Sequence, residues 1–157
     1  MITLTPMTPE YLDQVISLSI AEEQLPFVGT IEEVLANADD EVHPHLVLAD
    51  GHVVGIFLID TTYSVHYDFC SPNTLGFRAF LVDIKCQGLG YGSAVIAQLT
   101  DYLAPHYSNY NTVYLTVNCE NPVAYKCYLN NGFIDSGDVY LGGAAGPQHI
   151  MLKSLTA

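Results

Sequence analysis

A run of glycines between residues 88 and 92 is the first feature of the sequence that predicts chemistry. It lies in the segment Val82-Asp83-Ile84-Lys85-Cys86-Gln87-Gly88-Leu89-Gly90-Tyr91-Gly92, between a predicted strand and a predicted amphipathic helix. Glycine lets the backbone approach a ligand closely, and the first turn of a helix presents N–H groups that have no partner inside the helix. The positive end of the helix dipole at the same place favours an anion such as a pyrophosphate. The segment therefore predicts a binding site for an anionic group.

The spacing of these glycines argues against two other phosphate-binding loops. A dinucleotide-binding loop has the pattern GxGxxG, and Ser93 stands where its third glycine belongs. The Walker-type loop GxxxxGK[S/T] does not occur in the sequence. A tight turn that binds nothing is the alternative for this segment taken alone.

The charge of the chain restricts its partners. Four Lys and Arg residues stand against 17 Asp and Glu residues, which gives a formal net charge of −13. With so few cations, an anion must be held mainly by backbone N–H groups. Nucleic acid and anionic membranes both need a basic face, so we expect neither as a partner. The negative charge would attract a cationic small molecule, although an acidic surface that only confers solubility is the simpler explanation.

Length and hydropathy indicate one domain without an export or membrane segment. The chain has 157 residues, 50% of them hydrophobic, and we expect residues 1–157 to form a single domain. The longest uncharged apolar run, residues 53–59, is too short to span a bilayer, and the first residues lack the pattern of a signal peptide. We therefore expect a cytoplasmic protein. His43-Pro44-His45 has a spacing found in some metal sites, but no third ligand lies nearby and Pro44 predicts a loop, so no metal is expected.

The predicted elements form a mixed sheet covered by helices. Thr8-Pro9-Glu10 predicts the start of a helix that Pro26 ends, and Thr30 to Glu33 form a capping-box pattern for a second helix through about residue 38. Strands are expected at residues 2–5, 45–49, 53–61, 75–82, 113–117, 134–140 and 149–152, and further helices from residue 91 to just before Pro105 and at 122–131. The order β-α-α-β-β-β-α-β-α-β-β predicts an α/β fold of the α+β kind with a central mixed sheet.

A second polar segment follows the strand at residues 113–117. It reads Asn118-Cys119-Glu120-Asn121-Pro122-Val123-Ala124-Tyr125-Lys126-Cys127-Tyr128-Leu129-Asn130-Asn131-Gly132-Phe133. Together the two segments resemble the GNAT acetyltransferase superfamily. Its phosphate-loop pattern, Q/R-x-x-G-x-G/A, is matched by Gln87, Gly90 and Gly92, and its later pattern by Asn121, Ala124, Tyr128 and Gly132-Phe133. The resemblance covers residues 75 to 133, and both motifs lie at strand-to-helix junctions.

The resemblance implies that the chain transfers an acetyl group from acetyl-coenzyme A to a primary amine by direct attack on the thioester. The strands ending near Val82 and Val117 are then expected to separate, with pantetheine between them. The residues implied to bind the cosubstrate are Phe80, Leu81, Val82, Gln87, Gly88, Leu89, Gly90, Tyr91, Gly92, Ser93, Asn118 and Asn121. Tyr128 is implied to lie near the thioester sulfur, and core packing is its alternative role. Asn121 also fits a helix N-cap before Pro122.

The base and the acceptor are less well defined by the sequence. Histone-type members carry a Glu six residues before the position of Val82, and here that position is Gly76. The carboxylates of Asp60, Glu22 and Glu23 remain as candidates.

Two segments, residues 21–28 and 78–83, look like the bacterial spermine/spermidine acetyltransferase branch. This likeness implies a polyamine or another small cationic amine as acceptor, held by Glu22, Glu23 and Phe27. A non-catalytic acyl-CoA-binding or sensor domain is the alternative, because Gly76 lacks a carboxylate. A nucleotide-binding module is a third reading that Ser93 disfavours. Homodimer formation is left open.

Overall fold

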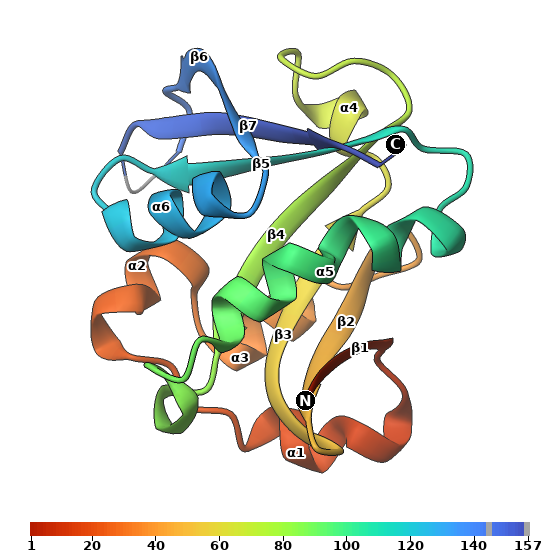
Figure 1. Ribbon diagram of the computed structural model, residues 1–157, viewed down its shortest axis with the longest axis vertical. Coiled ribbons are helices and arrows are strands. Elements are labelled where there is room, and N and C mark those ends of the chain that lie inside the picture. The colour runs from red at the N-terminus through yellow and green to blue at the C-terminus, as the bar shows by residue number, and fades with distance from the viewer. Residues whose placement is uncertain (144–145, 156–157) are drawn as a thin grey trace. The chain divides into compact units, whose positions relative to one another are not determined.

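The computed structural model describes residues 1–143 and 146–155, and within them seven strands form one mixed sheet in the order β1-β2-β3-β4-β5-β7-β6 (Figure 1). The strands are β1 (Ile2–Pro6), β2 (Val42–Ala49), β3 (His52–Asp60), β4 (Thr74–Val82), β5 (Thr112–Asn118), β6 (Ile134–Tyr140) and β7 (Gln148–Ser154). The helices are α1 (Leu12–Ile16), α2 (Leu25–Val28), α3 (Ile31–Ala36), α4 (Tyr63–His66), α5 (Tyr91–His106) and α6 (Pro122–Asn130). The predicted mixed α/β fold is confirmed.

The chain divides into two compact units. The first comprises Met1–Thr61 and Phe77–Val95, and the second comprises Thr62–Gly76 and Ile96–Ala157. Strand β4 and helix α5 each contribute residues to both units. A single domain over the whole chain stays a prediction.

The first unit is built on the antiparallel strands β1, β2 and β3. Asp50 and Gly51 join β2 to β3 with φ angles of 49° and 87°, which is the left-handed pair that a tight hairpin turn requires. Helices α1 and α3 pack on the apolar face of this hairpin. Val15 of α1 and Val34 of α3 belong to the same buried cluster as Leu46, Ile56 and Leu81 of the strands. The alternation of apolar side chains therefore positions the end of β4 on a well-packed core.

The second unit is built on β5, β7 and β6, which are antiparallel. The first residues of β4 pair in parallel with β5, from Thr74 opposite Thr112 to Gly76 opposite Tyr114. The predicted separation of these two strands further along stays a prediction. Helix α6 packs against β5 and β6. It ends as expected before Gly132, whose φ of 99° suits glycine.

Two prolines lie inside helices where the sequence predicted helix ends. The first helix already ends at Ile16, where the Ser17 hydroxyl donates to the carbonyl of Asp13 at 2.8 Å. Pro26 is instead the second residue of α2, a position whose N–H needs no partner. Pro105 lies inside the last turn of α5, which continues to His106. Neither proline therefore ends the helix that the sequence assigned to it.

Pro44 also departs from expectation, because it lies in strand β2 and not in a loop. The carbonyl of Pro44 accepts a hydrogen bond from the Met7 N–H at 3.0 Å, just past the end of β1. The side of β2 on which Pro44 lacks an N–H therefore has no paired strand at this position. The neighbouring His45 is buried and stacks on Phe57 with 5.4 Å between ring centroids. His45 is thus a core side chain.

Short helices after β3 and before Gly29 were not predicted. Helix α4 spans only Tyr63–His66, and α2 spans only Leu25–Val28. Among the described residues, no helix is long and apolar enough to cross a membrane. The second predicted helix is confirmed as α3, with the reciprocal capping box between Thr30 and Glu33.

Candidate active site

The glycine-rich loop lies between β4 and α5 (Figure 1). Gly88 and Gly90 adopt φ angles of 81° and 80°, which strain any residue that has a side chain. A Cβ atom added at Gly88, Gly90 or Gly92 would meet no atom within 4 Å. Among the described residues, no hydrogen bond leaves the N–H groups of Gly90, Tyr91 and Gly92. The loop therefore offers three donors at a helix N-terminus, with room for an anion beside them.

The segment before this loop is anchored to the core. The N–H of Asp83 donates to the carbonyl of Val54 at 2.7 Å, and the Asp83 carboxylate accepts the N–H of Lys85 at 3.0 Å. The side-chain amide of Gln87 donates to the carbonyl of Val82 at 3.4 Å. Two residues predicted to bind the cosubstrate thus contact each other and hold the start of the loop.

Strand β4 kinks immediately before Phe80. Ala79 has a φ of 54°, an unusual value for a residue with a side chain, and such strain is concentrated at functional sites. After the kink the Phe80 ring packs edge-on against Phe57, with 6.5 Å between centroids. A Cβ at Gly55 would lie 2.6 Å from the carbonyl oxygen of Leu81, so β3 approaches the end of β4 at a position that only glycine allows.

Two asparagines shape the start of α6 in the second unit. Asn118 is buried, and its side-chain oxygen accepts the N–H of Glu120 at 2.8 Å. The side chain of Asn121 accepts the N–H of Ala124 at 3.5 Å. Asn121 is therefore the N-cap of α6, as predicted, with Pro122 in the first turn. The predicted contact of Asn118 and Asn121 with the cosubstrate stays a prediction.

Tyr128 lies in α6 and is partly buried. Its ring meets Phe133 edge to face, with 5.7 Å between centroids. Burial raises the pKa of the Tyr128 hydroxyl above its ordinary value, and the neighbouring Cys127 acts in the same direction. The hydroxyl is therefore held in its protonated form, which can donate a hydrogen bond or a proton.

The proposed acceptor residues occupy an exposed turn. Glu22 and Glu23 are exposed and form a 3₁₀ turn with Gln24, and Phe27 of α2 is partly buried. A hollow of about 190 Å³ lies in the same unit, and its lining includes Ile20, Leu25 and Glu32. None of the three predicted acceptor residues lines it.

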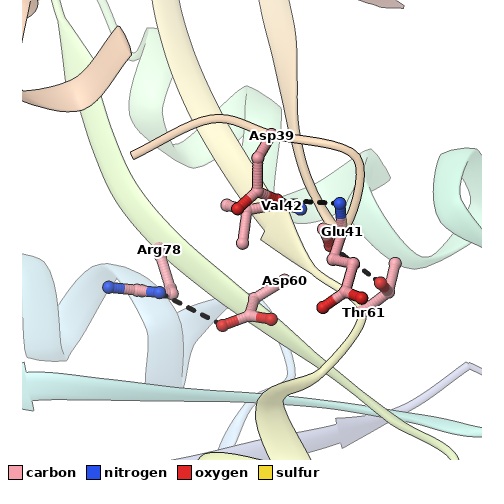
Figure 2. A network of polar contacts seen from close by, with 6 residues as sticks. All are labelled: Asp39, Glu41, Val42, Asp60, Thr61 and Arg78. Carbon is pink, nitrogen blue, oxygen red and sulfur yellow. Dashed lines mark hydrogen bonds and ion pairs between the residues drawn. The ribbon is translucent and has the colours of Figure 1, made fainter. Parts of the chain in front are cut away.

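Asp60, the remaining candidate base, is engaged in an ion pair. Its side chain is only 2% exposed, and Oδ2 lies 3.1 Å from a guanidinium nitrogen of Arg78, as Figure 2 shows. The same figure shows Thr61 bonded to the Glu41 carbonyl, and the carboxylate of Asp39 accepting the N–H groups of Glu41 and Val42. Because Asp60 has a charged partner, it is a poor candidate for a free base.

A model of the acetyltransferase (GNAT) family matches residues 12–133 of the chain. The chain belongs to this family. None of the curated proteins matches it. Among solved structures, aminoglycoside acetyltransferase AAC(6')-Ib in complex with paromomycin and acetyl-CoA is similar with a TM-score of 0.75 and 19% identity, covering 98% of this chain and 93% of that one. Spermidine N-acetyltransferase from Vibrio cholerae in complex with CoA and spermine has a TM-score of 0.70 and 20% identity, covering 98% and 95%. These likenesses establish the GNAT fold.

In this GNAT chain, a side chain already fills the space above Gly76. A Cβ built on Gly76 would lie 2.0 Å from Cδ1 of Tyr63, whose ring is buried. Tyr63 thus covers the position at which histone-type relatives carry a Glu, and a larger residue at position 76 would displace it. Glycine at this position is a packing requirement of the second unit.

The structure places the predicted site residues in both units. Residues 80–93, Glu22, Glu23 and Phe27 belong to the first unit, while Asn118, Asn121 and Tyr128 belong to the second. The sequence reading missed Tyr63, whose place over Gly76 depends on the short helix α4. The ion pair between Asp60 and Arg78 was also not predicted, although Arg78 is the only arginine in the sequence.

Proposed function

We propose that the chain is an N-acetyltransferase that moves an acetyl group from acetyl-CoA to a primary amine. The observation that carries this proposal is the open loop at Gly88–Gly92 in a GNAT chain, with N–H donors at a helix N-terminus and no side chain over them. A chain with only four Lys and Arg residues needs such backbone donors to hold a pyrophosphate.

The residues that would hold acetyl-CoA divide by the part of the molecule they would meet. The loop from Gln87 to Ser93 would bind the pyrophosphate, and the backbone of Phe80, Leu81 and Val82 would bind pantetheine. Asn118 and Asn121 would add contacts from the start of α6. The cosubstrate supplies a thioester whose acetyl carbon an amine can attack. No metal is part of the proposal.

The acceptor amine must lose a proton before or during attack. An alkyl amine has a pKa of about 10.4, so less than about one molecule in a thousand is neutral at about pH 7. Glu22 and Glu23 are candidates for receiving this proton, directly or through water. Asp60 is a weaker candidate because Arg78 holds it.

Tyr128 would act on the departing thiolate. A thiol has a reference pKa of about 8.5 and tyrosine of about 10, so full proton transfer from the phenol is uphill. Burial raises the pKa of Tyr128 further, which favours a hydrogen bond to the thiolate over complete transfer. Such a bond stabilises the leaving group without requiring a phenolate.

For the acceptor we propose a polyamine or a similar small cationic amine. The net charge of −13 and the exposed Glu22 and Glu23 support a cationic substrate. Two fold relatives carry amines in their crystal structures, spermine in one and an aminoglycoside in the other.

The test is a screen of amines with acetyl-CoA, in which acetylated product is measured by mass spectrometry. Product detection is preferable to a thiol reagent because Cys119 is exposed and would react with it. Acetylation of at least one small amine, with turnover beyond one equivalent, is the expected result. Binding of CoA without any product would instead favour the sensor domain, a reading that the carboxylate-free position at Gly76 keeps open.

A further inference from the structure

Five aromatic side chains of the second unit form one continuous cluster: Tyr63, Tyr67, Phe69, Tyr114 and Tyr140. Phe69 is at its centre, with ring centroids 6.0 Å from Tyr63, 5.2 Å from Tyr67, 6.1 Å from Tyr114 and 5.8 Å from Tyr140. Tyr67 also lies 5.4 Å from Tyr140, with the two rings nearly perpendicular at 78°. We call these five side chains the aromatic wall.

The aromatic wall has a buried base and a partly exposed surface. Tyr63 is 2% exposed and covers Gly76, whereas Tyr67, Phe69 and Tyr140 are all partly exposed. Within the described part of the chain, the hydroxyls of Tyr67 and Tyr140 make no hydrogen bond. The rings are therefore held by packing, and their π surfaces are only partly covered.

The segment between β3 and β4 contains one acidic residue, Asp68, and one histidine, His66. Asp68 stands between Tyr67 and Phe69, is exposed, and forms no ion pair or hydrogen bond with the described residues. Residues 62–76 contain no Lys or Arg. Aromatic faces attract a cation because the ring quadrupole presents negative charge there, and an exposed carboxylate in the same segment adds to this attraction.

We propose that the aromatic wall binds an ammonium group of the acceptor through cation–π contacts with Tyr67, Phe69 and Tyr140, assisted by Asp68. This inference rests on the proposed function, since it names the group that the same reaction would recognise. The link to the reaction is Tyr63, because it joins the wall to Gly76, which corresponds to the base position of histone-type relatives. The wall explains why position 76 is glycine, because the Tyr63 ring fills the space that a carboxylate side chain at this position would need.

The first measurement uses tetramethylammonium, which can neither donate a hydrogen bond nor be acetylated. Contact with ring faces moves its methyl proton resonance upfield, and titration gives an affinity. We expect saturable binding to the wild-type protein and weaker binding of tert-butanol, a neutral molecule of similar size. Equal binding of the two would overturn the proposal, because an apolar patch would explain it.

Variants of the wall distinguish the contribution of the ring face to binding from the contributions of side-chain volume and of the hydroxyl. Tyr67→Leu and Tyr140→Leu keep apolar volume and are expected to weaken tetramethylammonium binding by about three- to tenfold each. Tyr67→Phe keeps the ring and should bind as the wild type does. Tyr110→Leu is the matched control, since Tyr110 pairs with Tyr107 outside the wall at 6.1 Å. The proposal fails if both Leu variants, folded by thermal midpoint, bind the probe like the wild type.

The kinetic measurement distinguishes this inference from the proposed function. For a cationic amine that the enzyme acetylates, the same Leu variants should raise KM by a similar factor, with CoA affinity unchanged. If no amine is acetylated, the proposed function fails, while tetramethylammonium binding still decides whether the wall is a cation site. If amines are acetylated with unchanged KM in both Leu variants, the proposal of a cation site at the aromatic wall fails, and the proposed N-acetyltransferase function is retained.

Discussion

The buried carboxylate of Asp60 lies 3.1 Å from the guanidinium of Arg78, which is the only arginine in the sequence and is 38% exposed. The pair joins the end of β3 to β4 one residue before the kink at Ala79. A carboxylate with almost no access to water depends on its charged partner, because desolvation of an unpaired charge is costly. The pair therefore fixes the strand that precedes the proposed pantetheine-binding residues.

Replacing Arg78 by Met should destabilise the protein by about 3 kcal/mol, because the change leaves the charge of Asp60 buried without its guanidinium. Asp60→Asn should cost less, about 1–2 kcal/mol, since Arg78 can still be hydrated. Urea unfolding followed by circular dichroism measures both. If Arg78→Met unfolds at the wild-type urea concentration, the ion pair does not contribute to stability.

Gly90→Asp should abolish most CoA binding, because it places a side chain and a negative charge where the proposed pyrophosphate lies. Gly51→Asp is a close control: Gly51 has a φ of 87° against 80° for Gly90, and a Cβ at either position meets nothing within 4 Å. Both variants should lose similar amounts of thermal stability, because both positions have a positive φ. Calorimetry with CoA should find wild-type affinity in Gly51→Asp only. Equal affinity in the two variants would contradict the phosphate-loop assignment.

Local sequence signals predicted the elements that frame the glycine loop. The change of hydrophobic period after Val82, the glycines and the N-cap at Asn121 are all short-range signals, and β4, α5 and α6 begin within one residue of where they were expected. The prolines depart from expectation because a missing N–H matters only where it would have a hydrogen-bond partner. At Pro44 it would face the side of β2 just past the end of β1, and at Pro26 the helix is in its first turn.

The parts of the site that the sequence did not reveal depend on contacts between distant residues. Nothing in the composition of residues 61–73 predicts that Tyr63 covers Gly76, because the contact requires a four-residue helix, α4, followed by an aromatic cluster. The pairing of Asp60 with Arg78 likewise depends on strand register. A motif locates residues along the chain but does not give their partners in space.

Tyr128→Phe should lower kcat by more than about tenfold while leaving CoA affinity unchanged. The variant keeps the ring that packs on Phe133 and removes only the hydroxyl. Tyr125→Phe is the matched control in the same helix, one turn earlier, and should keep wild-type kcat. A wild-type kcat in Tyr128→Phe would return Tyr128 to a packing role.

The stabilising effect of Asp135 should depend on pH. The pKa of its carboxyl is lowered in the folded protein, first by the Gly137 N–H, next by the Tyr125 hydroxyl and less by His149. A lowered folded pKa means that the stabilisation is complete above the unfolded value of about 3.9 and is lost as pH falls through the folded value. The difference in urea midpoint between wild type and Asp135→Asn should therefore shrink as pH falls below about 4. Tyr125→Phe should reduce this pH dependence, and a difference that grows below about pH 4 would contradict the assignment.

Salt should slow the use of spermidine if charge attracts the acceptor. At physiological ionic strength the screening length is about 8 Å, so kcat/KM should fall as salt rises, while that of an uncharged acceptor stays level. Replacing Glu22 and Glu23 together by Gln should weaken the use of spermidine more than that of a monoamine, because a polyamine carries further charges to be held. The double variant Glu10→Gln and Asp13→Asn removes the same charge from another exposed turn and should leave the preference between acceptors unchanged. Equal effects of the two double variants would show that Glu22 and Glu23 are not part of the acceptor site. If no polyamine in a panel is acetylated, polyamines are excluded as acceptors, and the proposed acetyltransferase would act on another amine.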